Sequence, residues 1–366
     1  MPNECMRDCA TCGKCGKLPL LDSFRLTGQT VEARTGFGVA VDLGTTSVVL
    51  ALVDLSSGRI MARHSFLNPQ RAYGPDVISR INAANNGALA ELQHLITESI
   101  FTGLDSFKPY QPGEMVVAGN TTMIHLLLGL SCSSLGVSPF KPIYKLDQTY
   151  PLFGSNVTIP CWLAGFVGGD VTAGLLHVLP ERKERFLLID LGTNGEMAYY
   201  DRGRLTVTAT AAGPAFESGQ SGASETIGEL ARLVKTGDSI LTHKQVSELQ
   251  LAKSAVRSGL EILLENQPPL DAVYLAGGIG TAMNAQDAAC IGLIPPELVD
   301  QTIAVGNASL GGAVRLLLAP SRTAEDMKRL LADVTEINLA AHPRFNDLFM
   351  EHMSFEPPTT PTPGFQ

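Results

Sequence analysis

Two copies of Asp-Leu-Gly-Thr, at residues 42–45 and 190–193, carry the clearest chemical pattern in the sequence. Each copy lies between two apolar runs of strand-like length, which predicts a tight turn between β-strands. A glycine in such a turn has no Cβ, so backbone N–H groups can approach phosphate oxygens, and threonine hydroxyls add donors. Asp42 and Asp190 offer carboxylate oxygens to Mg²⁺ or to its water shell. The two turns therefore predict a clamp for one magnesium-bound polyphosphate.

Two further glycine-rich segments extend this site. Asp170 follows Gly168-Gly169 and is a third acidic candidate, which would orient an attacking water or hold one bound to Mg²⁺. The glycine turn at residues 277–280 follows an apolar strand and would lie against an adenosine. The predicted catalytic residues are Asp42, Asp170 and Asp190. The predicted nucleotide-binding residues are Gly44, Thr45, Thr46, Gly168, Gly169, Gly192, Thr193, Asn194, Gly213, Gly277, Gly278 and Gly280. One such motif alone would indicate an ordinary hairpin turn, but the set of four favours the phosphate site.

Four of the seven cysteines lie within the first fifteen residues. In a reducing compartment such crowding favours a metal site over disulfides. Zinc usually takes two close pairs separated by a longer finger, whereas spacings of three, two and two residues here bring four thiolates within eleven positions. This favours one four-iron four-sulfur (4Fe-4S) cluster. The predicted ligands are Cys5, Cys9, Cys12 and Cys15. Bound zinc, or an N-terminus without metal, remains the alternative.

The elements that must position these residues also occur twice. The strand pattern at residues 37–66 returns at residues 186–209, which predicts a duplicated α/β fold with a cleft between its halves. A C-terminal helix is expected at residues 308–318. The predicted organisation is a cysteine-rich iron-sulfur tip and linker (1–36), a first half (37–184), a second half with C-terminal helices returning to the hinge (185–353) and a disordered tail (354–366).

Composition excludes several classes of partner. The chain has 366 residues, of which 45% are hydrophobic and 17% charged, which is typical of a globular protein. Its net charge of −9 and its lack of a basic cluster argue against nucleic acid. No apolar run reaches the 18 or so residues of a membrane span, and no secretory signal precedes the cysteines, so we expect a cytoplasmic protein that does not bind membranes.

The four glycine motifs resemble, in order, the first phosphate, connecting, second phosphate and adenosine motifs of the actin, sugar kinase and heat-shock chaperone ATPase superfamily. The resemblance implies a duplicated actin-like ATPase fold, with ATP and Mg²⁺ bound in an interdomain nucleotide cleft. Further motifs resemble those of the reductive activators of corrinoid proteins, over about residues 37 to 353. These motifs lie at residues 68–70, 73–80, 119–123, 212–217 and 306–310.

This second resemblance implies an ATPase coupled to electron transfer. ATP would drive an electron from an iron-sulfur cluster to cobalt(II) in a corrinoid protein of a methyltransferase system, restoring cobalt(I). A separate electron donor is also implied, and a homodimer is left open. The family usually carries a two-iron ferredoxin domain, for which this chain has the short four-cysteine N-terminus. The alternatives are a small-molecule kinase of the same superfamily, or a non-redox ATPase with a zinc-bound tip that acts on another metalloenzyme.

Overall fold

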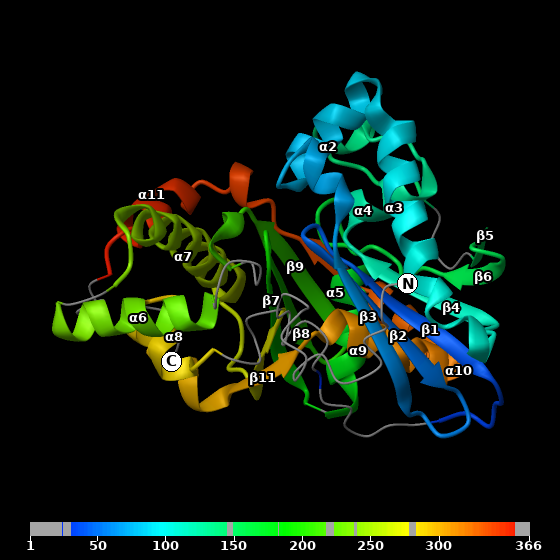
Figure 1. Cartoon of the computed structure of the whole chain (residues 1–366). Helices are drawn as coiled ribbons and strands as arrows, with labels where there is room; N and C mark the ends of the chain where they lie inside the picture. Colours follow the sequence, from blue (N-terminus) through cyan, green and yellow to red (C-terminus); the bar gives the residue numbers. More distant parts are fainter. Residues whose placement is uncertain are drawn as a thin grey trace.

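The fold comes from a computed structural model of the whole chain (Figure 1). The structure describes Phe24 and residues 31–144, 149–181, 183–216, 223–237, 240–277 and 283–355. The four N-terminal cysteines, Gly278, Gly280 and residues 356–366 of the predicted tail lie outside the described residues.

The first sheet has six strands in the order β3-β2-β1-β4-β6-β5. β1, β2 and β3 form an antiparallel meander, and β4 and β6 continue the sheet in parallel to β1. The strands are β1 (Phe37–Leu43), β2 (Ser47–Asp54), β3 (Ile60–Leu67), β4 (Glu114–Gly119), β5 (Thr149–Leu152) and β6 (Ser155–Thr158). Alternate β1 residues point to opposite faces, so Val39 and Val41 pack into one core and Ala40 into another.

The second sheet repeats this arrangement in the order β11-β10-β7-β8-β9-β12. β7, β8 and β9 form the antiparallel meander, and β10 and β11 continue in parallel. The strands are β7 (Arg185–Leu191), β8 (Gly195–Asp201), β9 (Arg204–Thr210), β10 (Ala272–Ala276), β11 (Thr302–Gly306) and β12 (Val334–Glu336). The predicted duplication of an α/β fold is confirmed.

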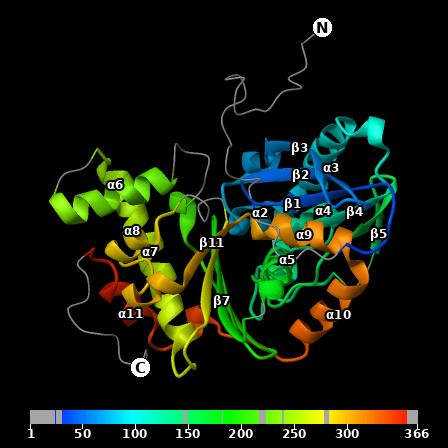
Figure 2. The ribbon, with the colours of Figure 1, turned by 90° about the horizontal axis from the view of Figure 1, so that it is seen from below.

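Helices cover the outer face of each sheet, and further helices lie between the sheets (Figure 2). The first sheet is covered by α2 (Val77–Ala83), a π-helical turn (Ala84–Ala88), α3 (Leu89–Asp105) and α4 (Thr121–Leu128). The second sheet is covered by α6 (Ala223–Thr236), α7 (His243–Leu264) and α8 (Ala285–Cys290). The core between the sheets includes α5 (Gly169–Val178), α9 (Ala308–Leu318) and α10 (Pro320–Leu331).

The remaining elements are short. They are 3₁₀ turns at Pro69–Tyr73, Lys108–Tyr110, Ser133–Leu135, Leu179–Glu181, Gly213–Phe216, Pro296–Gln301 and Leu339–Ala341, followed by α11 (Phe345–Glu351). Among the described residues, no helix is both long and apolar enough to cross a membrane.

The central helices α5 and α9 pack with their backbones in close contact. A Cβ on Gly312 of α9 would overlap the carbonyl oxygen of Ala173 in α5. α9 also packs against β1 and β4 of the first sheet, although it follows β11 of the second sheet in the chain. Each half of the duplicated fold is thus joined to the other through this pair of helices.

Candidate phosphate-binding site

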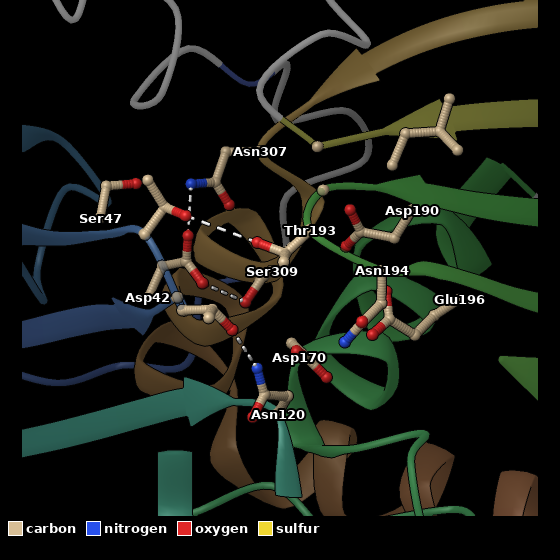
Figure 3. A pocket seen from close by; sticks show the side chains of 16 residues that line it. Asp42, Ser47, Asn120, Asp170, Asp190, Thr193, Asn194, Glu196, Asn307 and Ser309 are labelled. Atoms are coloured by element: carbon tan, nitrogen blue, oxygen red, sulfur yellow. Dashed lines mark hydrogen bonds between the residues drawn. The ribbon is translucent and has the colours of Figure 1, made fainter. Parts of the chain in front are cut away.

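A cavity of about 120 Å³ lies where the two meanders face each other (Figure 3). The first half contributes Asp42, Gly44, Thr45, Thr46, Ser47, Asn120 and Asp170. The second half contributes Asp190, Leu191, Gly192, Thr193, Asn194, Glu196, Gly277, Asn307 and Ser309. The structure therefore brings both Asp-Leu-Gly-Thr turns and all three predicted catalytic aspartates into one site.

The first turn is held by its own backbone. The Gly44 N–H donates to the Ser47 carbonyl oxygen at 3.0 Å, and a Cβ on Gly44 would lie only 2.7 Å from that oxygen. The turn thus requires glycine for its own closure. Asn120, at the start of α4, donates from Nδ2 to Thr45 Oγ1 at 2.9 Å, which orients the threonine hydroxyl.

The second turn faces the first across the cavity. The Gly192 N–H donates to the Asn194 carbonyl oxygen at 2.9 Å. A Cβ on Gly192 would meet no atom nearer than 4.0 Å, so the backbone is open to a ligand here. Thr46 Oγ1 and Thr193 Oγ1 lie 3.4 Å apart, so one hydroxyl from each turn reaches the same part of the cavity.

Asp42 is already engaged by the second half of the chain. Its Oδ2 accepts from Asn307 Nδ2 and its Oδ1 from Ser309 Oγ, both at 2.8 Å (Figure 3). Burial raises the pKa of Asp42, and the two hydrogen bonds oppose that rise. Asp42 therefore fastens β1 to the start of α9 as well as lining the cavity.

Asp170 and Asp190 have fewer protein partners. Asp170 Oδ1 accepts from the Val171 N–H at 2.8 Å. Burial raises the pKa of Asp170 to about 7, with a further rise from the charge of Asp42 and an opposing effect of the Val171 N–H. Burial raises the pKa of Asp190 to about 8, and the charges of Asp170 and Asp42 add to the rise. A bound divalent cation would relieve this repulsion, so the donor set fits Mg²⁺.

Glu196 is a fourth acidic residue of the site that the sequence analysis missed. It is only 8% exposed and pairs directly with Asp190 across β7 and β8, whereas the ladder partner of Asp42 is Val49. Burial raises the pKa of Glu196 well above its usual value, followed by the charges of Asp170 and Asp190. Three residues separate the strands in both turns, so the sequence carries no signal for this placement. The register of β8 on β7 differs by one residue from that of β2 on β1, and this difference puts Glu196 opposite Asp190.

Asn120, Asn307 and Ser309 were also missed as site residues. They lie in two of the motifs that carry the family resemblance, at residues 119–123 and 306–310. Asn120 and Asn307 are N-caps, which accept from the Met123 and Leu310 N–H groups. Their amide N–H₂ groups are left to donate to Thr45 and Asp42.

Other predicted residues lie outside the cavity lining. Cβ atoms on Gly168 and Gly169 would each lie 2.6 Å from backbone atoms, of Asn120 and Pro160 respectively, so these glycines let α5 start close to its neighbours. Gly213 begins a 3₁₀ turn away from the lining. Gly277 does line the cavity, and a Cβ there would overlap the Leu191 carbonyl oxygen. The roles assigned to these glycines stay predictions, as do those of Gly278 and Gly280 beyond the described part.

Within the part of the chain that the structure describes, no group of three or more His, Cys, Asp or Glu side chains has the geometry of a metal cage. Mg²⁺ commonly binds through one or two carboxylates together with waters and substrate phosphates. The acidic cavity is consistent with that kind of binding and not with a metal held by protein ligands alone.

The two sheets have similar strand orders and are joined by central helices, and each carries one Asp-Leu-Gly-Thr turn that faces the other. These features define the actin-like ATPase class of fold. Residues 37–180 match the RACo middle region, and residues 184–232 and 221–364 match the C-terminal domain of RACo, the ASKHA domain. The chain belongs to this family, which confirms the resemblance found in the sequence.

Two relatives show how far the likeness extends. The corrinoid activation enzyme RamQ of Eubacterium limosum is 31% identical over 423 aligned positions, which cover 87% of this chain and 70% of RamQ. A solved structure of a reductive activator for corrinoid, iron-sulfur protein superposes with a TM-score of 0.79 and 28% identity. That match covers 88% of this chain and 66% of the activator, so this chain spans just under two thirds of the activator's length.

Proposed function

We propose that this protein is an ATP-dependent reductive activator that passes one electron from an N-terminal iron-sulfur cluster to a corrinoid protein. The observation that carries the proposal is the acidic cavity between two facing Asp-Leu-Gly-Thr turns, in a chain of the RACo family. The names of RamQ and of the structurally similar activator support a corrinoid protein as the client.

Several groups would bind the nucleotide. The open backbone at Gly192 and the hydroxyls of Thr46 and Thr193 would donate to the phosphates. Mg²⁺ would neutralise charge on the phosphates and on Asp190, Asp170 and Glu196. Asp42 has both oxygens engaged by Asn307 and Ser309, so we assign it mainly to positioning these residues.

Hydrolysis requires a base near the attacking water. Asp170 lines the cavity, where its Oδ1 accepts the Val171 N–H, so its carboxylate would orient that water and accept its proton. The products are ADP and inorganic phosphate. Closure of the two halves around the nucleotide would couple this reaction to the rest of the molecule.

Electron transfer would use the cysteines outside the described residues. A 4Fe-4S cluster on Cys5, Cys9, Cys12 and Cys15 would take one electron from a low-potential donor protein and release it to cobalt(II), giving cobalt(I). For a one-electron step, each 59 mV of unfavourable potential costs tenfold in equilibrium, so an uphill transfer requires the coupling to ATP.

The test begins with anaerobic purification, iron and sulfide analysis, and electron paramagnetic resonance of the reduced protein. The reduced protein is then mixed with a cobalt(II) corrinoid protein, and cobalt(I) is followed by visible absorbance with and without ATP. We expect about one 4Fe-4S cluster per chain and ATP-dependent formation of cobalt(I).

Other results would overturn particular parts of the proposal. Tightly bound zinc without iron would favour the non-redox ATPase. Phosphorylation of an added sugar or carboxylate would favour the kinase. ATP-dependent reduction of another metalloenzyme, without any of a corrinoid protein, would leave the ATPase intact and show that the client is wrong.

A further inference from the structure

Phe24 lies between the cysteine-rich N-terminus and the folded body in the sequence, and it contacts the folded body through both its backbone and its ring. The backbone forms an isolated antiparallel β-bridge with Gly306. The ring meets the His177 ring edge-on, with centroids 5.9 Å apart and an interplanar angle of 90°. Phe24 also packs against the core between the two sheets. Cys15 precedes it by only nine residues.

Gly306, the backbone partner of Phe24, adjoins the lining of the phosphate cavity without being part of it. The Gly306 carbonyl oxygen accepts from the Gly277 N–H at 3.0 Å, and Gly277 lines the cavity. The residue after Gly306 is Asn307, which donates to Asp42. A ligand that orders Gly277 and Asn307 therefore orders the strand end to which Phe24 is paired.

The Phe24 ring packs against His177, which lies at the contact between α5 and α9 that joins the two halves. His177 is 3% exposed on α5, and its Nδ1 has no hydrogen-bond partner among the described residues. A Cβ on Gly311 of α9 would lie 2.5 Å from that nitrogen, so His177 fills the contact between the helices. α5 begins beside Asp170 and α9 beside Ser309, so both helices start in the phosphate cavity.

We propose that Gly306 and the α5–α9 contact form the docking surface of the N-terminal segment, with Phe24 as its anchor, and that nucleotide binding strengthens this docking. The inference rests on the proposed ATP site. Nucleotide binding and docking of the N-terminal segment each order the end of β11 and the same pair of helices, α5 and α9. Each therefore lowers the entropic cost of the other. Such coupling is reciprocal: whatever factor nucleotide adds to docking, docking adds to nucleotide affinity.

Trypsin provides a direct readout, because Arg25 follows Phe24 and is a cleavage site. The full chain is digested with and without Mg²⁺ and the non-hydrolysable ATP analogue AMPPNP, and cleavage after Arg25 is followed by mass spectrometry. Isothermal titration calorimetry of the same sample measures nucleotide binding. We expect saturating analogue to slow this cleavage about fivefold or more, in the range of ordinary coupling between sites.

Phe24→Ala tests reciprocity. We expect fast cleavage after Arg25 whether or not the analogue is present. The dissociation constant for the analogue should rise by about the factor by which the analogue slows cleavage of the wild type. Phe101→Ala is the matched control, because Phe101 also packs edge-on against an aromatic ring, that of Phe153, but on the outer face of the first sheet. It should behave as wild type in both measurements.

The failures are distinguishable. If calorimetry detects binding while wild-type cleavage after Arg25 is unaffected, the docking proposal is wrong and the proposed ATPase stands. An unchanged dissociation constant in a folded Phe24→Ala variant would also refute the coupling. If the wild type binds no nucleotide at all, the proposed function itself fails.

Discussion

Asp42 and Asp190 occupy equivalent positions in the two turns, yet their surroundings differ. Both oxygens of Asp42 accept hydrogen bonds from the start of α9. Asp190 instead lies opposite a second acid, Glu196, and near Asp170 (Figure 3). The two copies of the motif therefore differ: Asp42 joins the two halves, whereas the role of Asp190 toward a ligand stays a prediction.

Asp190 is the residue whose loss should affect hydrolysis most directly. Asp190→Asn keeps the shape of the side chain but removes the carboxylate that would bind Mg²⁺ or its water, so we expect phosphate release to slow on the order of 10²-fold. Asp105→Asn is the control, since Asp105 is an exposed residue at the end of α3 that pairs only with Lys108 among the described residues. Unchanged turnover in Asp190→Asn would remove this residue from the catalytic site.

The pKa of Asp190 also predicts how stability depends on pH. Its pKa is raised to about 8 by burial and by Asp170 and Asp42, against about 3.9 in an unfolded chain. Between these values the folded protein holds a proton that the unfolded chain has released, so stability falls as pH rises towards 8. We expect the Tm of nucleotide-free protein to fall by a few degrees from about pH 5.5 to about pH 8.

Differential scanning fluorimetry in buffers of matched ionic strength measures this slope. Asp190→Asn should make it shallower, although Asp170 and Glu196, whose pKa values are also raised, retain part of it. A Tm that rises over this pH range in the wild type would contradict the prediction.

At the level of the elements, local patterns predicted both meanders and the C-terminal helix. The helix expected at residues 308–318 is α9 (Ala308–Leu318), and both meanders lie where the repeated strand pattern predicted them. The contacts that complete the site could not be predicted in this way. Asn307 reaches Asp42 across 265 positions of sequence, and only the packing of α9 against the first sheet brings them together.

Asn307, the cap of α9, should therefore contribute more to the free energy of unfolding than an ordinary helix cap. Asn307→Ala removes the cap on the Leu310 N–H and the bond to Asp42, for an expected loss of about 2–3 kcal/mol in the free energy of unfolding. Asn284→Ala removes only the cap of α8, on the Gln286 and Asp287 N–H groups, for about 1 kcal/mol. Urea denaturation of both variants measures the difference. Equal losses would show that the Asp42 contact contributes nothing.

For the molecule as a whole, the site is made of parts that belong to different halves. Thr46 and Thr193 approach from the two meanders, and Asp42 receives bonds from α9. A ligand held by both turns must therefore stabilise the arrangement of the halves as well as each turn. The repeated motif was enough to predict that both turns meet at one cavity, because each half of the duplicated fold carries the same turn. That they clamp a polyphosphate stays a prediction.

We expect ATP to bind tightly between the two turns only when Mg²⁺ is present. Asp42, Asp170, Asp190 and Glu196 all line the cavity, so a triphosphate without a cation meets four acidic side chains. At a free concentration of 100 times its Kd, bound Mg-ATP would raise the free energy of unfolding by about 2.7 kcal/mol. Each tenfold loss of affinity would remove about 1.4 kcal/mol of this gain. We expect a clear rise in Tm with Mg-ATP, a much smaller one with ATP and EDTA, and none with EDTA alone. An equal rise with and without the chelator would show that the acids do not bind nucleotide through a metal ion.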